Sequence, residues 1–527
     1  MTDLSADVLV IGAGPCGGAA TWGLSGRGLD VLCIDRGGWM DHGAIGRDRP
    51  DYERRKQDVL HANPNIRRDR SDEPVDDAGS PIKPMIAHGA AGTSPYWAAH
   101  VPRFRPADFT MFSDDGVGAD WPLRYDDLAP FYDRVEAQWG TAQVTGDPTL
   151  PDRHAPVQPL PAIGAHGERV VRALEDKGWH WWPVDLAVGQ DGAAPETGFC
   201  THPGPCDIGC PSRQRSSSDR AFLAPAIARG ARFEPGMRVQ RLVTGPDGQV
   251  SHALCRRTGP AGEDTIRVFA RRFILAGGGM GTPRLLLLSG IASSSGLVGR
   301  NLMLHPHARM DALFDDPVGA WAPQELAGII SLEFFATDRS RGFLRGLKLQ
   351  LSPGPGPMAI ARGGASGQRL PWGADHHAAF EARFDHGMGM TVCVDDLPEH
   401  ANHIGLSTRM TDRDGLPAAS WHYRLGDNTR RILDFGLERA GELLTHAGAH
   451  TLHTTPLIAQ SGFHIMGTTA MRDDPARSVV DGFGRSHDVG NLFVADPSVF
   501  VTASSMNPTL TGQALALRTA EHVAQDL

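Results

Sequence analysis

Three glycines near the N-terminus have the spacing of a phosphate-binding turn. Gly12, Gly14 and Gly17 form a G-x-G-x-x-G motif directly after an apolar stretch. The first permits a tight turn, the second lets the backbone approach a pyrophosphate, and the third lets a helix pack closely on a strand. Asp35 ends the next apolar stretch, where an acid binds an adenosine ribose hydroxyl. The pattern predicts a dinucleotide cofactor, and the acid does not distinguish NAD from FAD.

A second group of residues that could act chemically opens a helix near the C-terminus. We expect Asn507 to cap this helix, with Pro508 at its first position. Leu510, Ala514 and Leu517 would give the helix one buried face. The start of such a helix has free N–H groups and a partial positive charge, which stabilise an anion. An ordinary capped helix is the alternative interpretation.

The elements that position these residues follow from the hydrophobic pattern. Residues 7–35 predict a strand, a glycine-rich turn, a helix and a second strand. Residues 271–279 predict another buried strand that ends in glycines. Residues 126–140 predict an amphipathic helix capped by Asp126. The polar residues 47–83 indicate a surface excursion, residues 87–97 a loop, and residues 146–163 a proline-rich linker.

The pattern changes between residues 301 and 460. Alternating apolar and polar residues at 391–397 and 403–410 predict an antiparallel sheet. A helix is expected to follow Asp427, and its apolar residues share one face. They are Leu433, Leu437, Ala440 and Leu444. Strand and helix signals return from His464 to the end of the chain.

Composition excludes several classes of protein. The 527 residues carry a net charge of −10 with acids and bases interspersed, so nucleic acid is not an expected partner. No apolar run could span a bilayer, and no basic segment precedes the first strand. We therefore expect a cytoplasmic protein without a membrane segment; export with a partner that carries a signal is the alternative. Seven scattered cysteines do not predict a disulfide framework.

Several further blocks carry a resemblance to a known family. They are the run Gly92-Thr93-Ser94 with the following residues, the run 116–132, and the C-terminal block that begins at His464. In these blocks the chain resembles the glucose–methanol–choline (GMC) family of FAD oxidoreductases. The run 116–132 is similar to its sugar-oxidising branch, which includes gluconate dehydrogenases and pyranose oxidases. Residues 301–460 match only loosely, and we expect substrate specificity to reside there.

The resemblance implies a fold and an enzyme class. The expected fold is α/β, with a discontinuous, Rossmann-like FAD-binding domain formed by residues 1–300 and 461–527. A substrate-binding domain with an antiparallel sheet, residues 301–460, would be inserted in it. The implied enzyme is an FAD-dependent oxidoreductase that oxidises a CH–OH group of a sugar, glycoside or related polyol. O2 or another acceptor would then remove the electrons.

The resemblance also assigns site residues. Taken alone, His464 would be a core histidine, but the family places a histidine base in this motif and a histidine or asparagine in the later one. His464 is thus the expected base, since histidine as a residue type has a pKa near operating pH, and Asn507 is expected to hold the substrate oxygen. The expected FAD-binding residues are Gly12, Gly14, Gly17, Asp35, Arg36, Gly92, Thr93, Ser94, Val239, Ala276, Asp496, Pro508 and Thr509. No metal ligand is expected: His305 and His307 form an H-x-H without an evident third ligand.

Three clustered cysteines leave an alternative open. Cys200, Cys206 and Cys210 have a spacing that resembles the [3Fe–4S] ligands of bacterial sugar dehydrogenases in this family. Residues 211–219 depart from that branch, so a tight turn without iron is favoured. With a cluster, the chain would be the catalytic subunit of a complex that passes electrons to a cytochrome partner. A flavin-binding protein without turnover is disfavoured, because both His464 and Asn507 are present.

The loop after Gly92 predicts that FAD is held non-covalently. Some sugar-oxidising relatives tether the flavin through a histidine in this loop. Aligned on Trp97, the corresponding position here is Tyr96. A tyrosine with a pKa near ~10 is a poorer nucleophile than imidazole at neutral pH. His88 and His100 flank the loop but fall outside the matched position.

Overall fold

The N-terminal motif forms the predicted strand–helix–strand unit. The computed structural model describes residues 2–40, 51–67, 72–154, 159–188, 210, 215–259, 262–320, 328–361 and 369–527. Strand β1 (Thr2–Ile11) leads through the glycine turn into α1 (Pro15–Leu24), and β2 (Val31–Ile34) pairs with β1 in parallel. Ile11 lies opposite Ile34, so both strands end at the same edge of the sheet. The residues that follow the two strands therefore meet at this edge.

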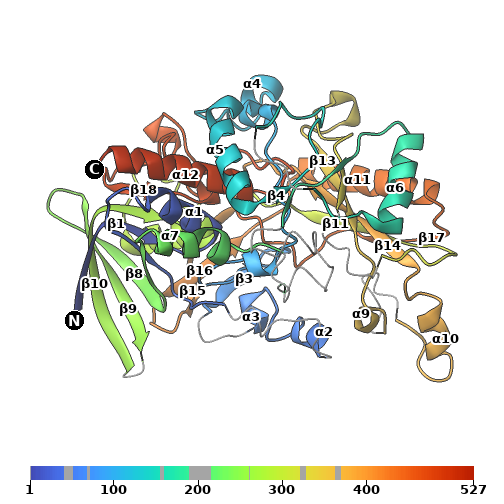
Figure 1. The fold of residues 1–527 in the computed structure, drawn as a ribbon, viewed down its shortest axis with the longest axis horizontal. Coiled ribbons are helices and arrows are strands. Elements are labelled where there is room, and N and C mark those ends of the chain that lie inside the picture. Colours follow the sequence, from blue (N-terminus) through green and yellow to red (C-terminus); the bar gives the residue numbers. More distant parts are fainter. Residues whose placement is uncertain are drawn as a thin grey trace.

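Distant parts of the chain complete this sheet. Its order is β7-β2-β1-β10-β9-β8, and β18 pairs with β10. The added strands are β7 (Arg232–Glu234), β8 (Met237–Thr244), β9 (Val250–Gly259), β10 (Gly262–Leu275) and β18 (Leu492–Val494). Helix α12 (Thr509–Gln525) packs beside α1, and Figure 1 shows the two lying together although they are at opposite ends of the sequence. The predicted α/β fold is confirmed.

A second, antiparallel sheet lies on the other side of the molecule (Figure 1). Its order is β17-β11-β14-β13-β12-β5. The strands are β17 (Thr451–Thr455), β11 (His307–Leu313), β14 (Gly387–Val394), β13 (Leu347–Ser352), β12 (Ile329–Ser331) and β5 (Trp182–Pro183). Helix α11 (Asp427–His446) packs against this sheet and against α6 (Gly164–Asp176). The four apolar residues predicted for one face of α11 are buried, as expected.

A third sheet corrects the expectation for residues 47–83. Strand β3 (Val75–Gly79) pairs in parallel with β16 (Pro417–His422), which pairs with β15 (His403–Thr411). Val75 and Ile82 are buried in the same apolar cluster as β16. The prediction of a surface excursion was therefore wrong for the residues around β3, because a polar sequence conceals one short buried strand. The remaining helices and strands are α2 (Tyr52–Arg55), α3 (Pro64–Arg67), α4 (Met111–Asp115), β4 (Thr141–Ala142), β6 (Leu186–Ala187), α7 (Ala224–Ala228), α8 (Gly278–Ser289), α9 (Pro357–Ala361) and α10 (His376–Glu381).

Two predicted helix caps are wrong. Helix α5 (Tyr125–Trp139) begins one residue before Asp126, and the carboxylate of Asp127 accepts from the backbone N–H of Arg124 at 2.7 Å. Helix α12 begins at Thr509, and no side chain caps it. The amide oxygen of Asn507 instead accepts a hydrogen bond from Lys348. Sequence patterns locate these helices well, whereas their first residues depend on tertiary contacts.

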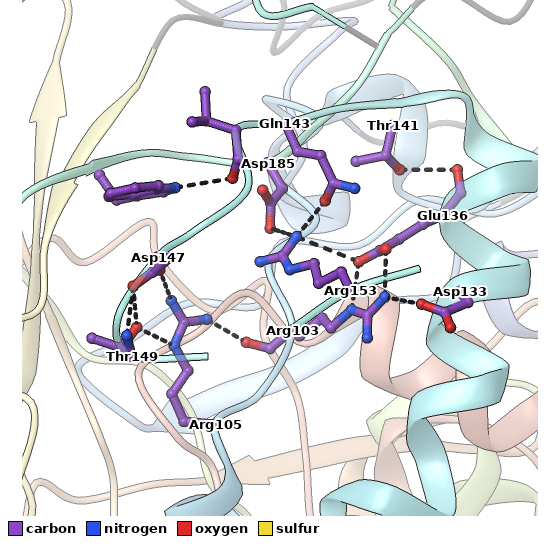
Figure 2. A network of polar contacts seen from close by, with 12 residues as sticks. Arg103, Arg105, Asp133, Glu136, Thr141, Gln143, Asp147, Thr149, Arg153 and Asp185 are labelled. Atoms are coloured by element: carbon purple, nitrogen blue, oxygen red, sulfur yellow. Dashed lines mark hydrogen bonds and ion pairs between the residues drawn. The ribbon is translucent and has the colours of Figure 1, made fainter. Parts of the chain in front are cut away.

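Buried ion pairs fix the segment that the sequence marked as a linker. Figure 2 shows Arg103 and Arg153 converging on Glu136 of α5. The guanidinium of Arg103 donates to Glu136 at 2.6 Å, and Arg153 donates to Asp185 at 2.7 Å. Glu136 has no exposed side-chain area, so burial raises its pKa against the influence of Arg103. The segment around Arg153 is thus held to α5 and to Asp185 by charge.

Removing one member of this network should destabilise the protein strongly. Arg103→Met leaves the buried Glu136 without its main partner, which we expect to lower the free energy of unfolding by about 3–5 kcal/mol. Denaturant unfolding followed by far-UV circular dichroism measures the loss. The control is Arg430→Met, since Arg430 forms an exposed pair with Asp427 and should change little. Equal unfolding midpoints for the two variants would contradict this role for Arg103.

Candidate active site

A cavity of about 270 Å³ opens at the edge where the parallel strands of the first sheet end. This is where open α/β sheets bind their ligands. The predicted residues on its wall are Gly12, Gly14, Asp35, Arg36, Gly92, Thr93, Val239, Ala276, His464, Asp496, Pro508 and Thr509. Gly17, Ser94 and Asn507 are not on the wall. The structure thus brings residues from the whole length of the chain to one cavity.

The glycines of the turn allow backbone segments to approach closely. A Cβ on Gly12, where φ is 109°, would lie 2.3 Å from the carbonyl oxygen of Ala276. A Cβ on Gly17 would lie 1.8 Å from the carbonyl oxygen of Gly12, so Gly17 serves helix–strand packing. A Cβ on Gly92 would lie 2.8 Å from the Cα of Gly14. The Gly92 loop therefore rests directly on the glycine turn.

Ser94 holds this loop from behind. Its hydroxyl donates to the carbonyl of Ala91 at 2.8 Å and accepts from the backbone N–H of Ser218 at 3.0 Å. The side chain is buried. Ser94 therefore positions Gly92 and Thr93 instead of facing the cavity itself.

Two buried carboxylates link segments of the cavity wall by hydrogen bonds. Asp35 accepts from the backbone N–H groups of Ala13 at 2.9 Å and Gly37 at 2.8 Å. Asp496 accepts from the backbone N–H of Gly278 at 2.9 Å and the hydroxyl of Thr282 at 2.5 Å. Burial raises the pKa of both carboxyls, and these hydrogen bonds oppose the shift. Each carboxylate oxygen can accept a second hydrogen bond from a ligand hydroxyl.

Sequence reasoning placed Arg36 at the cavity wall but missed the two charged residues that cluster with it, Glu73 and Arg284. Glu73 forms ion pairs with Arg36 and, at 2.7 Å, with Arg284. Burial alone would raise the pKa of Glu73, but the two guanidinium groups hold it at about 2. The ring Nε2 of His88 is buried here and has no hydrogen-bond partner among the residues that the structure describes. A buried polar atom of this kind favours a polar ligand at this wall.

The histidine base predicted from the sequence has a partner that the sequence did not reveal. His464 Nδ1 lies 2.8 Å from His305 Nδ1, and His305 Nε2 lies 3.1 Å from the carbonyl oxygen of Ala503. A carbonyl oxygen only accepts, so His305 carries its proton on Nε2. Neutral His305 then accepts at Nδ1, and His464 must donate from its own Nδ1. The chain of hydrogen bonds leaves the Nε2 of His464 with a free lone pair.

Burial and the nearby charge of Lys348 keep this pair neutral. Burial lowers the pKa of His464 well below 6.5, and His305, His307 and Lys348 lower it further. Burial likewise lowers the pKa of His305 to about 3. Both rings are therefore neutral at physiological pH, as the tautomers above require.

Asn507 lies four residues after Ala503, whose carbonyl anchors His305, and its amide is held by the second sheet. Its Oδ1 accepts a hydrogen bond from Lys348 Nζ at 2.7 Å. Lys348 belongs to β13, where it is a single lysine in an otherwise alternating apolar strand. Such a lysine looks like an exposed residue in the sequence, so the strand pattern gave no signal. The H-x-H of His305 and His307 was a usable signal, because both histidines are buried at the start of β11, His307 as its first residue and His305 two residues before it.

Metal binding finds no support in the described part of the chain. Within those ranges, no group of three His, Cys, Asp or Glu side chains is placed to hold an ion. Cys210 is buried and its Sγ accepts from the backbone N–H of Arg215. Cys200 and Cys206 lie outside the described residues, so the iron–sulfur alternative stays open. None of the described helices is long and apolar enough to cross a membrane.

Comparison with known proteins identifies the family. Residues 115–307 and 398–516 match the N- and C-terminal family models of GMC oxidoreductases. A 2-methyl-1,2-propanediol dehydrogenase of Mycolicibacterium austroafricanum is 32% identical over 98% of this chain and 95% of its own length. The chain belongs to the GMC oxidoreductase family. It is therefore an oxidoreductase with FAD as its cofactor, and the resemblance seen in the sequence is confirmed.

Other relatives cover the chain equally well. The large subunit of a fructose dehydrogenase of Gluconobacter japonicus is 29% identical over 99% of this chain and 98% of its own. A 6'''-hydroxyparomomycin C oxidase of Streptomyces lividus is 30% identical over 99% and 92%. Among solved structures, a formate oxidase of Aspergillus oryzae aligns over 100% of this chain and 99% of its own with a TM-score of 0.68 at 15% identity. That likeness shows the shared fold.

A bulky side chain in the glycine turn should prevent this GMC oxidoreductase from retaining FAD. Gly14 is on the cavity wall, so Gly14→Leu would fill space that the cofactor needs. The flavin absorbance per protein after desalting measures retention. Gly38→Leu is the control, because a Cβ there meets no atom within 4 Å. A folded Gly14→Leu variant with full flavin content would contradict this assignment.

The structure leaves the prediction of a non-covalent flavin open to a direct test. Tyr96 ends the short turn Ser94–Tyr96 and is not on the cavity wall. Its ring faces the guanidinium of Arg67, 5.9 Å from the ring centre. We expect acid precipitation to release all the flavin into the supernatant. Flavin that stays in the pellet, on a peptide containing Tyr96, His88 or His100, would refute the prediction.

Proposed function

We propose that this enzyme oxidises a CH–OH group of a sugar, glycoside or related polyol, with His464 as the base that takes the hydroxyl proton. The observation that carries the proposal is the neutral histidine pair, in which Ala503 fixes the tautomer of His305 and His305 fixes that of His464. A lone pair on His464 Nε2 is the feature that a general base needs. The names of the relatives support a hydroxyl donor, since they are dehydrogenases or oxidases of a diol, fructose and an aminoglycoside.

The cavity wall suggests which residues would hold the cofactor. Gly12 and Gly14 would admit the pyrophosphate, and Asp35 would accept from the adenosine ribose. The start of α12, at Pro508 and Thr509, lies on the wall near His464. Its free N–H groups would stabilise negative charge on the reduced ring. When bound, FAD supplies the acceptor for the hydride that leaves the carbinol carbon.

The residues of the chain would divide the remaining work. His464 Nε2 accepts the hydroxyl proton while Asn507 Nδ2 donates a hydrogen bond to the substrate oxygen. As the proton and the hydride leave, the carbinol carbon becomes a carbonyl. The low pKa of His464 makes it a weak base, so the developing alkoxide needs compensation. The hydrogen bond that Asn507 Nδ2 donates to the substrate oxygen would provide it.

The electron acceptor separates two versions of this function. An oxidase returns the electrons to O2, and a dehydrogenase passes them to another acceptor. In the alternative version, an iron–sulfur cluster at Cys200, Cys206 and Cys210 hands them to a cytochrome partner. Iron analysis of the purified protein and a search for co-purifying subunits distinguish this version.

Anaerobic bleaching of the flavin tests the proposed reaction. The panel contains 2-methyl-1,2-propanediol, D-fructose, D-gluconate, simple glycosides and an aminoglycoside. Loss of the oxidised flavin absorbance with at least one of these compounds, and a carbonyl product, is the expected result. Readmission of O2 then shows whether oxygen is the acceptor. A flavin that stays oxidised with every compound in the panel would refute the proposed substrate class.

His464→Ala should keep FAD and lose flavin reduction. Removal of a general base slows such a step by about 10²–10⁴-fold. Anaerobic stopped-flow absorbance, with the panel compound that reduces the wild type fastest, measures the rate. His450→Ala is the control, since His450 is exposed. Near-normal reduction by His464→Ala at neutral pH would remove His464 from the mechanism.

The pH dependence of the same rate follows from the sign of the pKa shift. A base acts only when it is neutral, and the pKa of His464 lies well below 6.5. The limiting rate of flavin reduction should therefore stay level as the pH is lowered through 6.5. A decline in this rate that fits a single protonation with a midpoint at pH 6.5 or above would contradict a buried, neutral His464.

A further inference from the structure

A buried lysine lies behind Asn507, and the mechanism predicted from the sequence did not include it. Lys348 is 1% exposed. Its ammonium donates to Asn507 Oδ1 at 2.7 Å. Within the described residues it forms no ion pair with a carboxylate. The lysine is therefore a buried cation whose nearest polar partner is a neutral amide.

The second sheet places this lysine in a row of polar side chains. In the sheet, Lys348 is paired with Cys393 on β14, which is paired with His307 on β11. Partners across neighbouring strands share one face of a sheet. Cys393 donates from its thiol to the carbonyl of Ser505 at 3.3 Å. This face therefore contacts the segment from Ser505 to Asn507, just before α12.

Packing alone does not explain a lysine at this position. An ammonium without a counter-charge is costly to bury, and burial accordingly lowers the pKa of Lys348. A methionine has a similar length and would fill the same space without that cost. Stability would therefore favour the methionine, and the lysine must serve something else. Among the described residues its one direct side-chain partner is Asn507, the residue expected to hold the substrate oxygen.

The chemistry of the two groups fixes the orientation of the amide. An ammonium has donors and no acceptor, so it must face the Oδ1 of Asn507 and not its Nδ2. Nδ2 is then directed away from the lysine with both its donors. No hydrogen bond from this nitrogen occurs within the described residues, and the side chain is only half-buried. The lysine thus leaves an amide donor free one residue before Pro508, which is on the cavity wall.

We propose that Lys348 is a positioning residue that locks the amide of Asn507 with its Nδ2 donors towards the substrate oxygen. The inference rests on the proposed function, because it assigns Asn507 to that oxygen. An amide free to rotate would present its Oδ1 to the substrate for part of the time, and this oxygen repels a developing alkoxide. The ammonium excludes that orientation. It also polarises the amide, which strengthens the hydrogen bond that Nδ2 donates.

Two substitutions separate positioning from packing. Lys348→Met removes the donor, and Lys348→Gln keeps an N–H donor without the charge. We expect Lys348→Met to slow the limiting rate of anaerobic flavin reduction by roughly 10-fold to 100-fold, as misplacement of a reacting group does. The apparent substrate affinity should change less than about 3-fold, because the interaction acts mainly in the transition state. On a logarithmic scale, the rate of Lys348→Gln should lie at least halfway between that of Lys348→Met and that of the wild type.

The decisive test combines Lys348→Met with Asn507→Ala. If Lys348 acts through Asn507, Lys348→Met should change the rate by less than about 3-fold once Asn507 is alanine. The probe is the compound of the panel above that reduces the wild-type flavin fastest. Lys177→Met is the matched control, since Lys177 forms its ion pair with Glu442 on α11, far from this segment in the sequence. Equal losses in the two backgrounds, or a Lys348→Met rate equal to that of the wild type, would overturn the proposal.

Thermal unfolding tests the proposal without a substrate. Because the buried ammonium is costly, Lys348→Met should unfold at the wild-type temperature or above it, with its full FAD content. A fall of more than about 5 °C, which for a large domain exceeds 1 kcal/mol, would mean that the lysine is structural, and would overturn the proposal. A wild-type protein whose flavin no compound reduces would refute the proposed function instead. The two failures are thus told apart.

Discussion

The hydrogen bond between the Nδ1 atoms of His305 and His464 is the interaction on which the account of this site depends. Two ring nitrogens at 2.8 Å share one proton, so one must donate and the other must accept. The carbonyl of Ala503 decides which, because it accepts from the far side of His305. Through His305, the carbonyl of Ala503 thereby determines which ring nitrogen of His464 carries the proton. Without that anchor, either tautomer of His464 would satisfy the pair.

The two large sheets contribute different halves of the site. The parallel sheet ends at the glycine turn and at Asp35, and forms a wall suited to a dinucleotide. The antiparallel sheet turns one face, with Cys393 and Lys348, towards the segment before α12. That segment carries Asn507, while His464 comes from a separate loop. The cofactor wall and the polar groups that we propose for a substrate hydroxyl therefore come from segments far apart in the sequence.

Residues whose roles follow from local spacing could be predicted, and those whose roles follow from strand pairing could not. The turn that brings Gly12 and Gly14 to the cavity is a local pattern, so the sequence alone sufficed. The family resemblance predicted His464. Lys348 gave no signal, because its neighbours depend on the register of β13 with β14 and on the segment that covers them. The predicted cap at Asn507 was wrong for the same reason: a distant lysine takes the oxygen that the helix would have used.

The tautomer of His464 tests the account most directly. Nitrogen-15 NMR of protein labelled in its histidine rings distinguishes a protonated ring nitrogen from a bare one, and a His464→Gln spectrum assigns the signals by difference. At pH 7 the account predicts a neutral His464 with its proton on Nδ1 and a neutral His305 with its proton on Nε2. A His464 protonated on Nε2, or on both nitrogens, would contradict it, because Nε2 would then have no lone pair for a substrate proton.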